Sequence, residues 1–444
     1  MTVFIEQAQI IWKRGFVKKI LVNSMASVVG VILPAIIMLP FFGYFSRLLP
    51  VEQFGIFTIC FAILGYSGLF DAGLSRAVVR TLTIREKLRL SEGDILGTAL
   101  AFSAILSSFA SLILYLNADS ICNLLSISYN LKIHAVASIE YLSLAITPMI
   151  LSLVLLSKLE AQQDFVTFNK IKLINSILSV IPCLVLAQFI NPMEGAILGI
   201  VLGRIFSFIN TIFHIKDSIS ITGFGFSKPS AKALFSFGGW ITVSNFVSPI
   251  MVYFDRFILS SMLGADKVAF YSMPSELITK INFLPVSIVR VFFPLLSGIE
   301  SYNRNSFEVV YKKLVLFFVV SMFFGVASLL FFSEDIIRIW LGQSYVEVAA
   351  KVMQILLIGY FFNGLSQLPV LYMQSQGNSK SIAILHLFEV VPYLTALYFF
   401  IDLFGIYGAA YAWCLRVIFD NFALVYIAHI RKSKSKFILS RYDF

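Results

Sequence analysis

Charged residues are scarce in this chain of 444 residues: they make up 13% of it, against 59% hydrophobic residues. Soluble domains carry roughly 25% charged residues, so this composition excludes a soluble fold. Apolar runs of about 20 residues recur along the chain, and this is the length that crosses the hydrocarbon of a bilayer. Because the runs lack the alternating polarity of barrel strands, the sequence predicts an all-α membrane protein.

Cysteines and catalytic motifs are equally sparse. The four cysteines lie far apart, at spacings that fit neither a disulfide framework nor a metal or redox site. The sequence holds no phosphate-binding glycine loop, no cluster of metal ligands and no pairing of nucleophile with base. The connectors between the apolar runs are too short for an extramembrane domain. We therefore expect no catalytic residue, no metal and no cofactor, and a protein that is not an enzyme.

The apolar runs define twelve candidate transmembrane helices. Of the 34 Lys and Arg residues, 24 lie on one side of these spans and five on the other. Because Lys and Arg gather on the cytoplasmic side, this bias predicts a multi-pass protein with both termini in the cytoplasm. The net charge of +10 then reflects topology, and nucleic acid is not an expected partner. The predicted spans are 24–46, 54–76, 94–116, 136–157, 173–190, 196–214, 236–262, 270–297, 314–333, 349–374, 382–401 and 405–428.

Two pairs of segments repeat at an offset of 213 to 214 residues, close to half the chain length. SRLLPVEQFGIF (46–57) resembles SSMLGADKVAFY (260–271), and EGAILGIVLGR (194–204) resembles YGAAYAWCLR (407–416). The repeats predict two six-helix lobes. Because six is even, the lobes share one topology and are expected to be related by a pseudo-two-fold axis along the membrane normal.

Prolines interrupt the first span, at Pro34 and Pro40, and the seventh span, at Pro249. Interrupted helices at matching positions of two halves point to the central cavity of a transporter, although membrane helices also tolerate proline in general. The predicted parts are a basic amphipathic interfacial segment (1–23), an N-terminal lobe (24–214), a cytoplasmic linker (215–235), a C-terminal lobe (236–429) and a basic cytoplasmic tail (430–444).

Some charged residues fall within the predicted spans, where each would cost roughly 2.5–3.5 kcal/mol if it faced lipid. They must face each other or water. Glu276 and Lys280 have the i, i+4 spacing of a helical ion pair, and Arg416 and Asp420 share it. Such pairs fit a structural role as well as a functional one. The intramembrane charges are Asp71, Glu140, Arg204, Asp255, Arg256, Glu276, Lys280, Arg290, Glu389, Arg416 and Asp420.

Asp255 and Arg256 are neighbours, so on a helix they point about 100° apart and each needs a partner elsewhere. Arg204 and Arg290 have no acidic residue within four positions, which favours a place in a cavity. Guanidinium groups stay ionised and match phosphate oxygens, so a wet cavity with several arginines would suit an anionic, phosphate-bearing cargo.

Several segments, spread over nearly the whole chain, resemble the Wzx-type O-antigen flippases. These belong to the superfamily of multidrug and oligosaccharidyl-lipid/polysaccharide exporters. The segments are LLPVEQFGIFTICFAILGYSGLFDAGLSRAVVR (48–80), DRFILSSMLGADKVAFYSMPSEL (255–277), VRVFFPLLSGI (289–299), WLGQSYVEVAAKVMQILLIG (340–359) and FGIYGAAYAWCLRVIFD (404–420).

The resemblance implies a twelve-helix, two-lobed transporter in the bacterial inner membrane. It implies a lipid-linked oligosaccharide as substrate, joined through pyrophosphate to undecaprenol and moved by alternating access coupled to H+ or Na+. Membrane lipids are expected to surround a functional monomer, with a polysaccharide polymerase and a chain-length regulator as candidate partners.

The resemblance also implies a cationic cavity, and residue type and position decide which residues fit it. The candidate headgroup ligands are Arg204, Arg256, Lys280, Arg290 and Arg416. The acids that could bind the coupling ion or balance charge are Asp255, Glu276, Glu389 and Asp420, and His386 is a weaker candidate for proton coupling.

Three alternatives stay open at this point. A multidrug or metabolite cation antiporter of the same superfamily would favour acidic cavities. A membrane-embedded polysaccharide polymerase or glycosyltransferase would need a longer outer loop than the segments 117–133 and 333–348. A channel or scaffold would not need two proline-interrupted halves.

Overall fold

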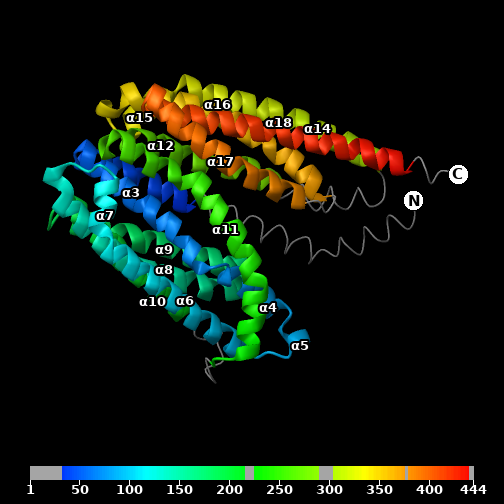
Figure 1. Ribbon diagram of the computed structural model, residues 1–444, viewed down its shortest axis with the longest axis horizontal. Coiled ribbons are helices and arrows are strands. Elements are labelled where there is room, and N and C mark those ends of the chain that lie inside the picture. Colours follow the sequence, from blue (N-terminus) through cyan, green and yellow to red (C-terminus); the bar gives the residue numbers. More distant parts are fainter. Residues whose placement is uncertain (1–32, 216–224, 290–303, 376–378, 440–444) are drawn as a thin grey trace. The chain divides into compact units, whose positions relative to one another are not determined.

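The computed structural model describes residues 33–215, 225–289, 304–375 and 379–439. All regular structure in these residues is helical (Figure 1), so the all-α prediction is confirmed for them. The interfacial segment 1–23 and Arg290 lie outside the described residues, as do parts of the predicted linker and tail.

Nine helices in the described part of the chain are long and apolar enough to cross a membrane. The protein is thus a multi-pass membrane protein. The count of twelve spans stays a prediction, because parts of the first and eighth predicted spans lie outside the described residues.

The helices of the first half of the chain follow the predicted spans closely. A helix over Leu33–Leu48 precedes the others. The remaining elements are α3 (Val51–Ser67), η1 (Gly68–Asp71), α4 (Leu74–Thr83), α5 (Arg85–Leu88), α6 (Glu92–Leu116), α7 (Ala118–Leu124), α8 (Tyr129–Ala161), α9 (Phe165–Leu186) and α10 (Pro192–Ile215).

The second half continues the pattern. Most of its helices extend beyond the apolar windows at one or both ends, but α12 ends at Ile281, inside the predicted span 270–297, so that span is not one continuous helix. The elements are α11 (Lys228–Leu263), α12 (Ala265–Ile281), α14 (Arg304–Phe331), α15 (Ser333–Trp340), η3 (Gln343–Tyr345), α16 (Val346–Ser375), α17 (Ser379–Phe404) and α18 (Ile406–Leu439).

The second predicted span, 54–76, differs from the structure at its end. The backbone turns at Ala72 and Gly73, which both have positive φ. The Asp71 carboxylate accepts hydrogen bonds from the backbone N and the hydroxyl of Ser75, which starts α4 in a new direction. One face of α4 is buried and Arg76 is exposed on the other, so α4 is an amphipathic helix rather than the end of a span.

The described residues form two compact units. Unit 1 contains residues up to Phe41, Ile63–Asp119 and Ile133–Asn245. Unit 2 contains Phe42–Ala62, Ser120–Lys132 and the chain from Phe246 onward. Two short segments of the first half of the chain therefore group with the second half.

In unit 1, α9 and α10 are held together by a row of small residues. A Cβ on Gly199 would come within 2.3 Å of the Cys183 Cα, and one on Gly203 within 2.6 Å of the Ser179 Cα. Only glycine allows backbones to come this close, and small residues at four-residue spacing drive such packing in membranes. Gly195 begins the row, which Ser207 and Thr211 continue.

In unit 2, α16 packs against α12, α14 and α18 (Figure 1). Gly359 lets α16 approach α18, because a Cβ there would meet the Trp413 ring at 2.5 Å. Asn421 of α18 donates hydrogen bonds to the Phe362 carbonyl at 3.3 Å and to Ser366 Oγ at 3.2 Å. Small residues and buried amides thus join these two helices, as expected where lipid gives no hydrophobic driving force.

Segments that repeat in the sequence make matching local contacts. Within unit 2, Ser46 Oγ donates to the Leu341 carbonyl at 3.0 Å, and Ser260 Oγ donates to the Leu125 carbonyl at 2.7 Å. The two serines are matched by the internal repeat, and each carbonyl follows a short helix, α15 or α7.

A second pair of contacts repeats in the same way. A Cβ on Gly195 would lie 2.5 Å from the Leu186 carbonyl oxygen, and one on Gly408 would lie 1.8 Å from that of Phe400. These contacts support the internal repeat, while the symmetry axis between two six-helix lobes stays a prediction.

Candidate functional site

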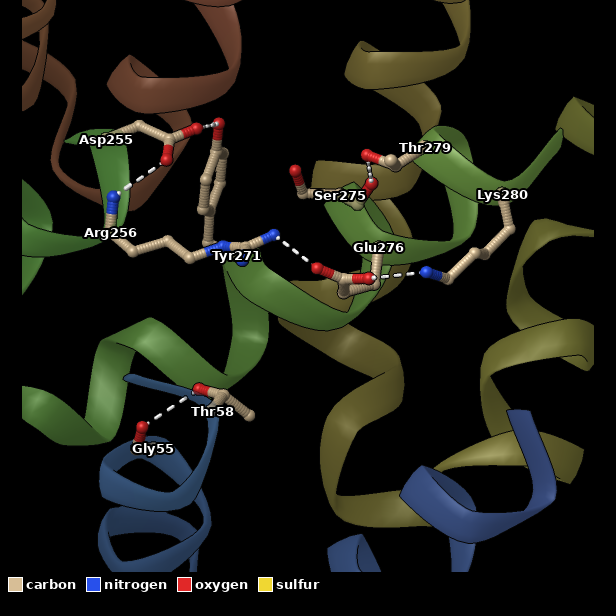
Figure 2. Close-up of polar contacts among 9 residues, drawn as sticks. All are labelled: Gly55, Thr58, Asp255, Arg256, Tyr271, Ser275, Glu276, Thr279 and Lys280. Atoms are coloured by element: carbon tan, nitrogen blue, oxygen red, sulfur yellow. Dashed lines mark hydrogen bonds and ion pairs between the residues drawn. The ribbon is translucent and has the colours of Figure 1, made fainter. Parts of the chain in front are cut away.

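Asp255 and Arg256 of α11 and Glu276 and Lys280 of α12 form a cluster of charged residues (Figure 2). Asp255 and Arg256 are both buried, with side chains that have to find polar partners inside the protein. The Asp255 carboxylate accepts a hydrogen bond from the Tyr271 hydroxyl at 2.6 Å and from the Arg256 backbone N at 2.8 Å. The expectation that each of these neighbours needs a partner elsewhere is confirmed.

Arg256 finds that partner on α12. Its Nη2 donates to Glu276 Oε1 at 2.9 Å, and its guanidinium lies over the Tyr253 ring at 5.3 Å from the centroid. Lys280 Nζ approaches the other oxygen of Glu276 at 3.5 Å, which confirms the predicted i, i+4 pair. The Arg256 side chain is 1% exposed and that of Lys280 is 36% exposed, so the cluster has a buried side and an open side.

Arg416 of α18 has a different environment. Its guanidinium lies over the Tyr393 ring at 5.3 Å, and Nη1 meets the sulfur of Met251 at 3.2 Å. In the part of the chain that the structure describes, no carboxylate oxygen lies within 4.0 Å of it. The predicted Arg416–Asp420 ion pair is therefore wrong: the guanidinium turns toward an aromatic ring and a thioether, which are weak partners.

Two carboxyl groups face each other between α17 and α18. Glu389 and Asp420 are both largely buried and lie within hydrogen-bonding reach of one another. Neither oxygen of Glu389 accepts a hydrogen bond from a donor group among the described residues. His386 Nε2 lies 3.4 Å from Asp420 Oδ1. Two carboxylates this close repel each other unless a proton or a cation lies between them.

Arg204 belongs to unit 1, whereas the other described cationic candidates belong to unit 2. It follows Gly203 in the row of small residues on α10 and is partly buried, and its Nε has no hydrogen-bond partner. The sequence predicted that all five cationic candidates line one cavity. The structure describes four of them, and three of these, Arg256, Lys280 and Arg416, belong to the same unit.

Some polar groups of the interior were missed by sequence reasoning. Tyr271 and Tyr393 partner the buried charges, but nothing distinguishes them in sequence from other tyrosines. Lys158 directly follows the predicted span 136–157, on the side predicted to be cytoplasmic, yet its side chain is 0% exposed and pairs with Glu92 at 2.5 Å. Glu92 also pairs with Arg85. The signal in the sequence was an acid at the start of α6, near several basic residues.

Within the described residues, no group of three or more His, Cys, Asp or Glu side chains is arranged to hold a metal ion. The described residues do offer a guanidinium without a carboxylate partner, Arg416, and a pair of neighbouring carboxyl groups, Glu389 and Asp420.

Proteins with similar sequences indicate the family of this chain. A family model described as "Polysaccharide biosynthesis protein" matches residues 44–350. The "Putative O-antigen transporter" of Shigella flexneri is 36% identical over 409 residues, which cover 92% of this chain and 97% of that protein.

Two solved structures share the fold. One is an inward-facing multidrug resistance MATE family transporter, with a TM-score of 0.76 and 15% identity, covering 92% of this chain and 98% of that chain. The other is the lipid II flippase MurJ in an inward closed conformation, with a TM-score of 0.73 and 17% identity, covering 96% and 93%.

The chain is a multi-pass membrane protein, and its relatives indicate a transporter and not an enzyme. The chain belongs to the polysaccharide biosynthesis protein family, which confirms its resemblance to the O-antigen flippases.

Proposed function

We propose that this protein is a flippase that moves undecaprenyl-pyrophosphate-linked oligosaccharide repeat units across the bacterial inner membrane. The units would build O-antigen or a similar surface polysaccharide. The observation that carries the proposal is the 36% identity, over 92% of the chain, to a protein described as an O-antigen transporter. A glycan on a diphosphate cannot cross hydrocarbon alone, because burial of unpaired charge is prohibitive.

Arg416 is the leading candidate for the contact with the diphosphate. Its guanidinium has no carboxylate within 4.0 Å among the described residues and rests on Tyr393, which leaves its donors available. A phosphate oxygen is a far stronger acceptor than the Met251 thioether. Lys280, on the open side of its cluster, is the second candidate. Arg204 and Arg290 keep their predicted role in the cavity, and Arg256 is committed to Glu276.

The Glu389–Asp420 pair is the proposed site of the coupling ion. A proton or Na+ between the two carboxyl groups would remove their repulsion, and His386 beside Asp420 could exchange a proton with it. Arg416 lies on the same helix as Asp420, and its charge acts on Glu389. Occupation of the acid pair would therefore change the field at the proposed headgroup ligand. This link is the proposed basis of ion coupling.

The reciprocal contacts of Ser46 and Ser260 are the proposed gate on the side opposite the termini. In addition to the two serine–carbonyl hydrogen bonds, Arg47 donates to the Ile339 carbonyl, and a Cβ on Gly55 would lie 1.9 Å from the Ala265 carbonyl oxygen. Segments of both halves of the sequence meet here. Alternating access requires that such a contact opens and closes.

The gate can be tested with Gly55→Ala, which forces this contact apart. Ser260→Cys serves as the reporter, because Ser260 is fully buried and the four native cysteines are buried as well. We expect an impermeant thiol reagent, added outside, to label Ser260→Cys faster when Gly55→Ala is present. The matched control is Gly325→Ala, where a Cβ would meet nothing within 4 Å. Unchanged labelling in the Gly55→Ala background would contradict the gate.

The function itself is tested by deletion of the gene and complementation with the intact chain. We expect the deletion to strand lipid-linked repeat units on the inner leaflet and to remove the surface polysaccharide. Normal surface polysaccharide in the deletion strain, in a host without a second flippase, would contradict the proposal.

A multidrug or metabolite cation antiporter remains the second candidate. It is favoured by the acid pair and by the fold shared with a multidrug transporter. A deletion strain with intact polysaccharide and raised sensitivity to cationic drugs would select the antiporter instead.

A further inference from the structure

Unit 2 carries an open groove of about 790 Å³ that the proposed function does not use. Three helices form it: α14, α16 and α18. It lies at the end of these helices from which α15 leaves α14. Its walls are mainly apolar and aromatic; Lys351 is the one charged lining residue, and the amide of Gln354 donates to Ser333 Oγ at 2.8 Å. The residues that define its character are Leu330, Phe331, Lys351, Ile358, Tyr407 and Tyr411.

Lys351 is the unusual member of this groove. It is exposed and lies five residues after the start of α16 at Val346, about 7.5 Å along the helix axis. Glu347 is one turn earlier, but among the described residues no carboxylate oxygen comes within 4.0 Å of the ammonium group. An unpaired lysine against apolar walls in a membrane protein needs an anion from its surroundings or access to the interface.

The groove is separate from the charged cluster. Tyr407 and Tyr411 lie on α18, as Arg416 does. Nine residues separate Tyr407 from Arg416, which is about two and a half turns and puts the two side chains on opposite faces of the helix. Exposed apolar residues continue the Tyr411 face along α18, at Leu415 and Phe422. The groove therefore opens on the face that lipid covers.

We infer that this groove is a binding site for an anionic phospholipid, with the phosphate beside Lys351 and an acyl chain between α14 and α18. One cation matches the single charge of a phosphodiester such as that of phosphatidylglycerol, whereas a diphosphate would leave charge unpaired. Tyrosines favour the headgroup depth, where the ring is dry and the hydroxyl is wet. With both termini in the cytoplasm, as the charge bias predicts, this end lies in the outer leaflet.

The test uses the purified full chain in micelles with equal amounts of phosphatidylglycerol and phosphatidylcholine, followed by native mass spectrometry. We expect the wild type to retain phosphatidylglycerol preferentially. Lys351→Gln should lower that preference about fivefold, the factor that corresponds to about 1 kcal/mol per basic residue at an anionic surface.

A second variant tests the shape of the groove independently of charge. Ala327→Trp places a ring in the groove and should remove the retained lipid. Ala428→Trp is the matched control, because Ala428 lines a separate pocket of about 150 Å³ between the same three helices and should leave retention unchanged. Retention of phosphatidylglycerol by both tryptophan variants would contradict the site.

Two further outcomes would overturn the inference. Equal retention of the two lipids by the wild type would show that Lys351 selects no anion. Displacement of phosphatidylglycerol by an equimolar amount of undecaprenyl phosphate would identify the polyprenyl carrier as the occupant instead of a phospholipid. Neither result depends on whether the protein is a flippase.

Discussion

The two charge clusters of unit 2 differ in whether their charged side chains are paired. On α11 and α12, Arg256 is buried and paired with Glu276 at 2.9 Å. On α17 and α18, Arg416 has no carboxylate within 4.0 Å in the described part of the chain, while Glu389 faces another acid. The side chains of a buried ion pair already satisfy each other. Charged side chains without an ion-pair partner require a substrate or an ion from outside the protein. We therefore propose that the buried Arg256–Glu276 pair serves stability and that the second cluster, together with Lys280 on the open side of the first, serves transport.

The largest effect is expected from Arg256→Ala. The change leaves Glu276 largely buried with only Lys280 nearby, and breaking a buried pair in this way costs about 3–5 kcal/mol. We expect a large fall in the thermal unfolding temperature of the purified protein and in its abundance in membranes. Replacing both partners, as Arg256→Met with Glu276→Leu, should recover most of the loss. If Arg256→Ala were as stable as the wild type, the Arg256–Glu276 pair would not be stabilising and the proposed difference between the clusters would be wrong.

Glu389→Gln should act on transport and not on folding. It keeps the size of the side chain, removes its charge and relieves the repulsion from Asp420. We expect export of repeat units to fall about tenfold or more, the factor that 1.4 kcal/mol makes in an equilibrium, at unchanged abundance. Asp402→Asn is the control, because Asp402 lies exposed on the same helix. Wild-type export by Glu389→Gln would remove the acid pair from the transport cycle.

Arg416→Ala should weaken substrate binding. A hydrogen bond to a charged group contributes roughly 1.5–3 kcal/mol, so half-saturation should need about 10- to 150-fold more substrate. Arg416→Lys should fall between alanine and wild type, because lysine keeps the charge but loses the planar fork. Arg338→Ala, an exposed residue paired with Asp335, is the control. Identical half-saturation in all four proteins would show that Arg416 is structural.

The smallest effect on stability is expected from Lys280→Gln. Its ion pair with Glu276 is partly exposed and spaced i, i+4, which is worth about 0.3–0.5 kcal/mol. Unfolding should hardly change, while export falls measurably if the lysine meets the headgroup as proposed. Loss of stability comparable to that of Arg256→Ala would mean that the open side of the cluster is as essential as its buried side.

Hydropathy located the helices well, because the thickness of the bilayer sets the length of every apolar run. It did not locate the turn at Ala72 and Gly73, which depends on a local hydrogen bond from Ser75 to Asp71. The polar residues around that turn did not interrupt the predicted span 54–76, because the average hydropathy of the span is apolar.

The charged residues were found from sequence, but their partners were predicted only where both lie on one helix. Glu276–Lys280 is such a pair and forms. Arg416–Asp420 has the same spacing and does not form, because Tyr393 and Met251 from other helices hold the guanidinium. Spacing along one helix carries no information about what a neighbouring helix offers.

The most direct measurement is flipping in vesicles that contain the purified chain, lipid-linked repeat units and an imposed gradient of H+ or Na+. The account predicts that repeat units reach the opposite leaflet only when a gradient is present, and that Glu389→Gln vesicles show no such response. Gradient-driven flipping at the wild-type rate by Glu389→Gln, or no flipping by the wild type under either gradient, would contradict it.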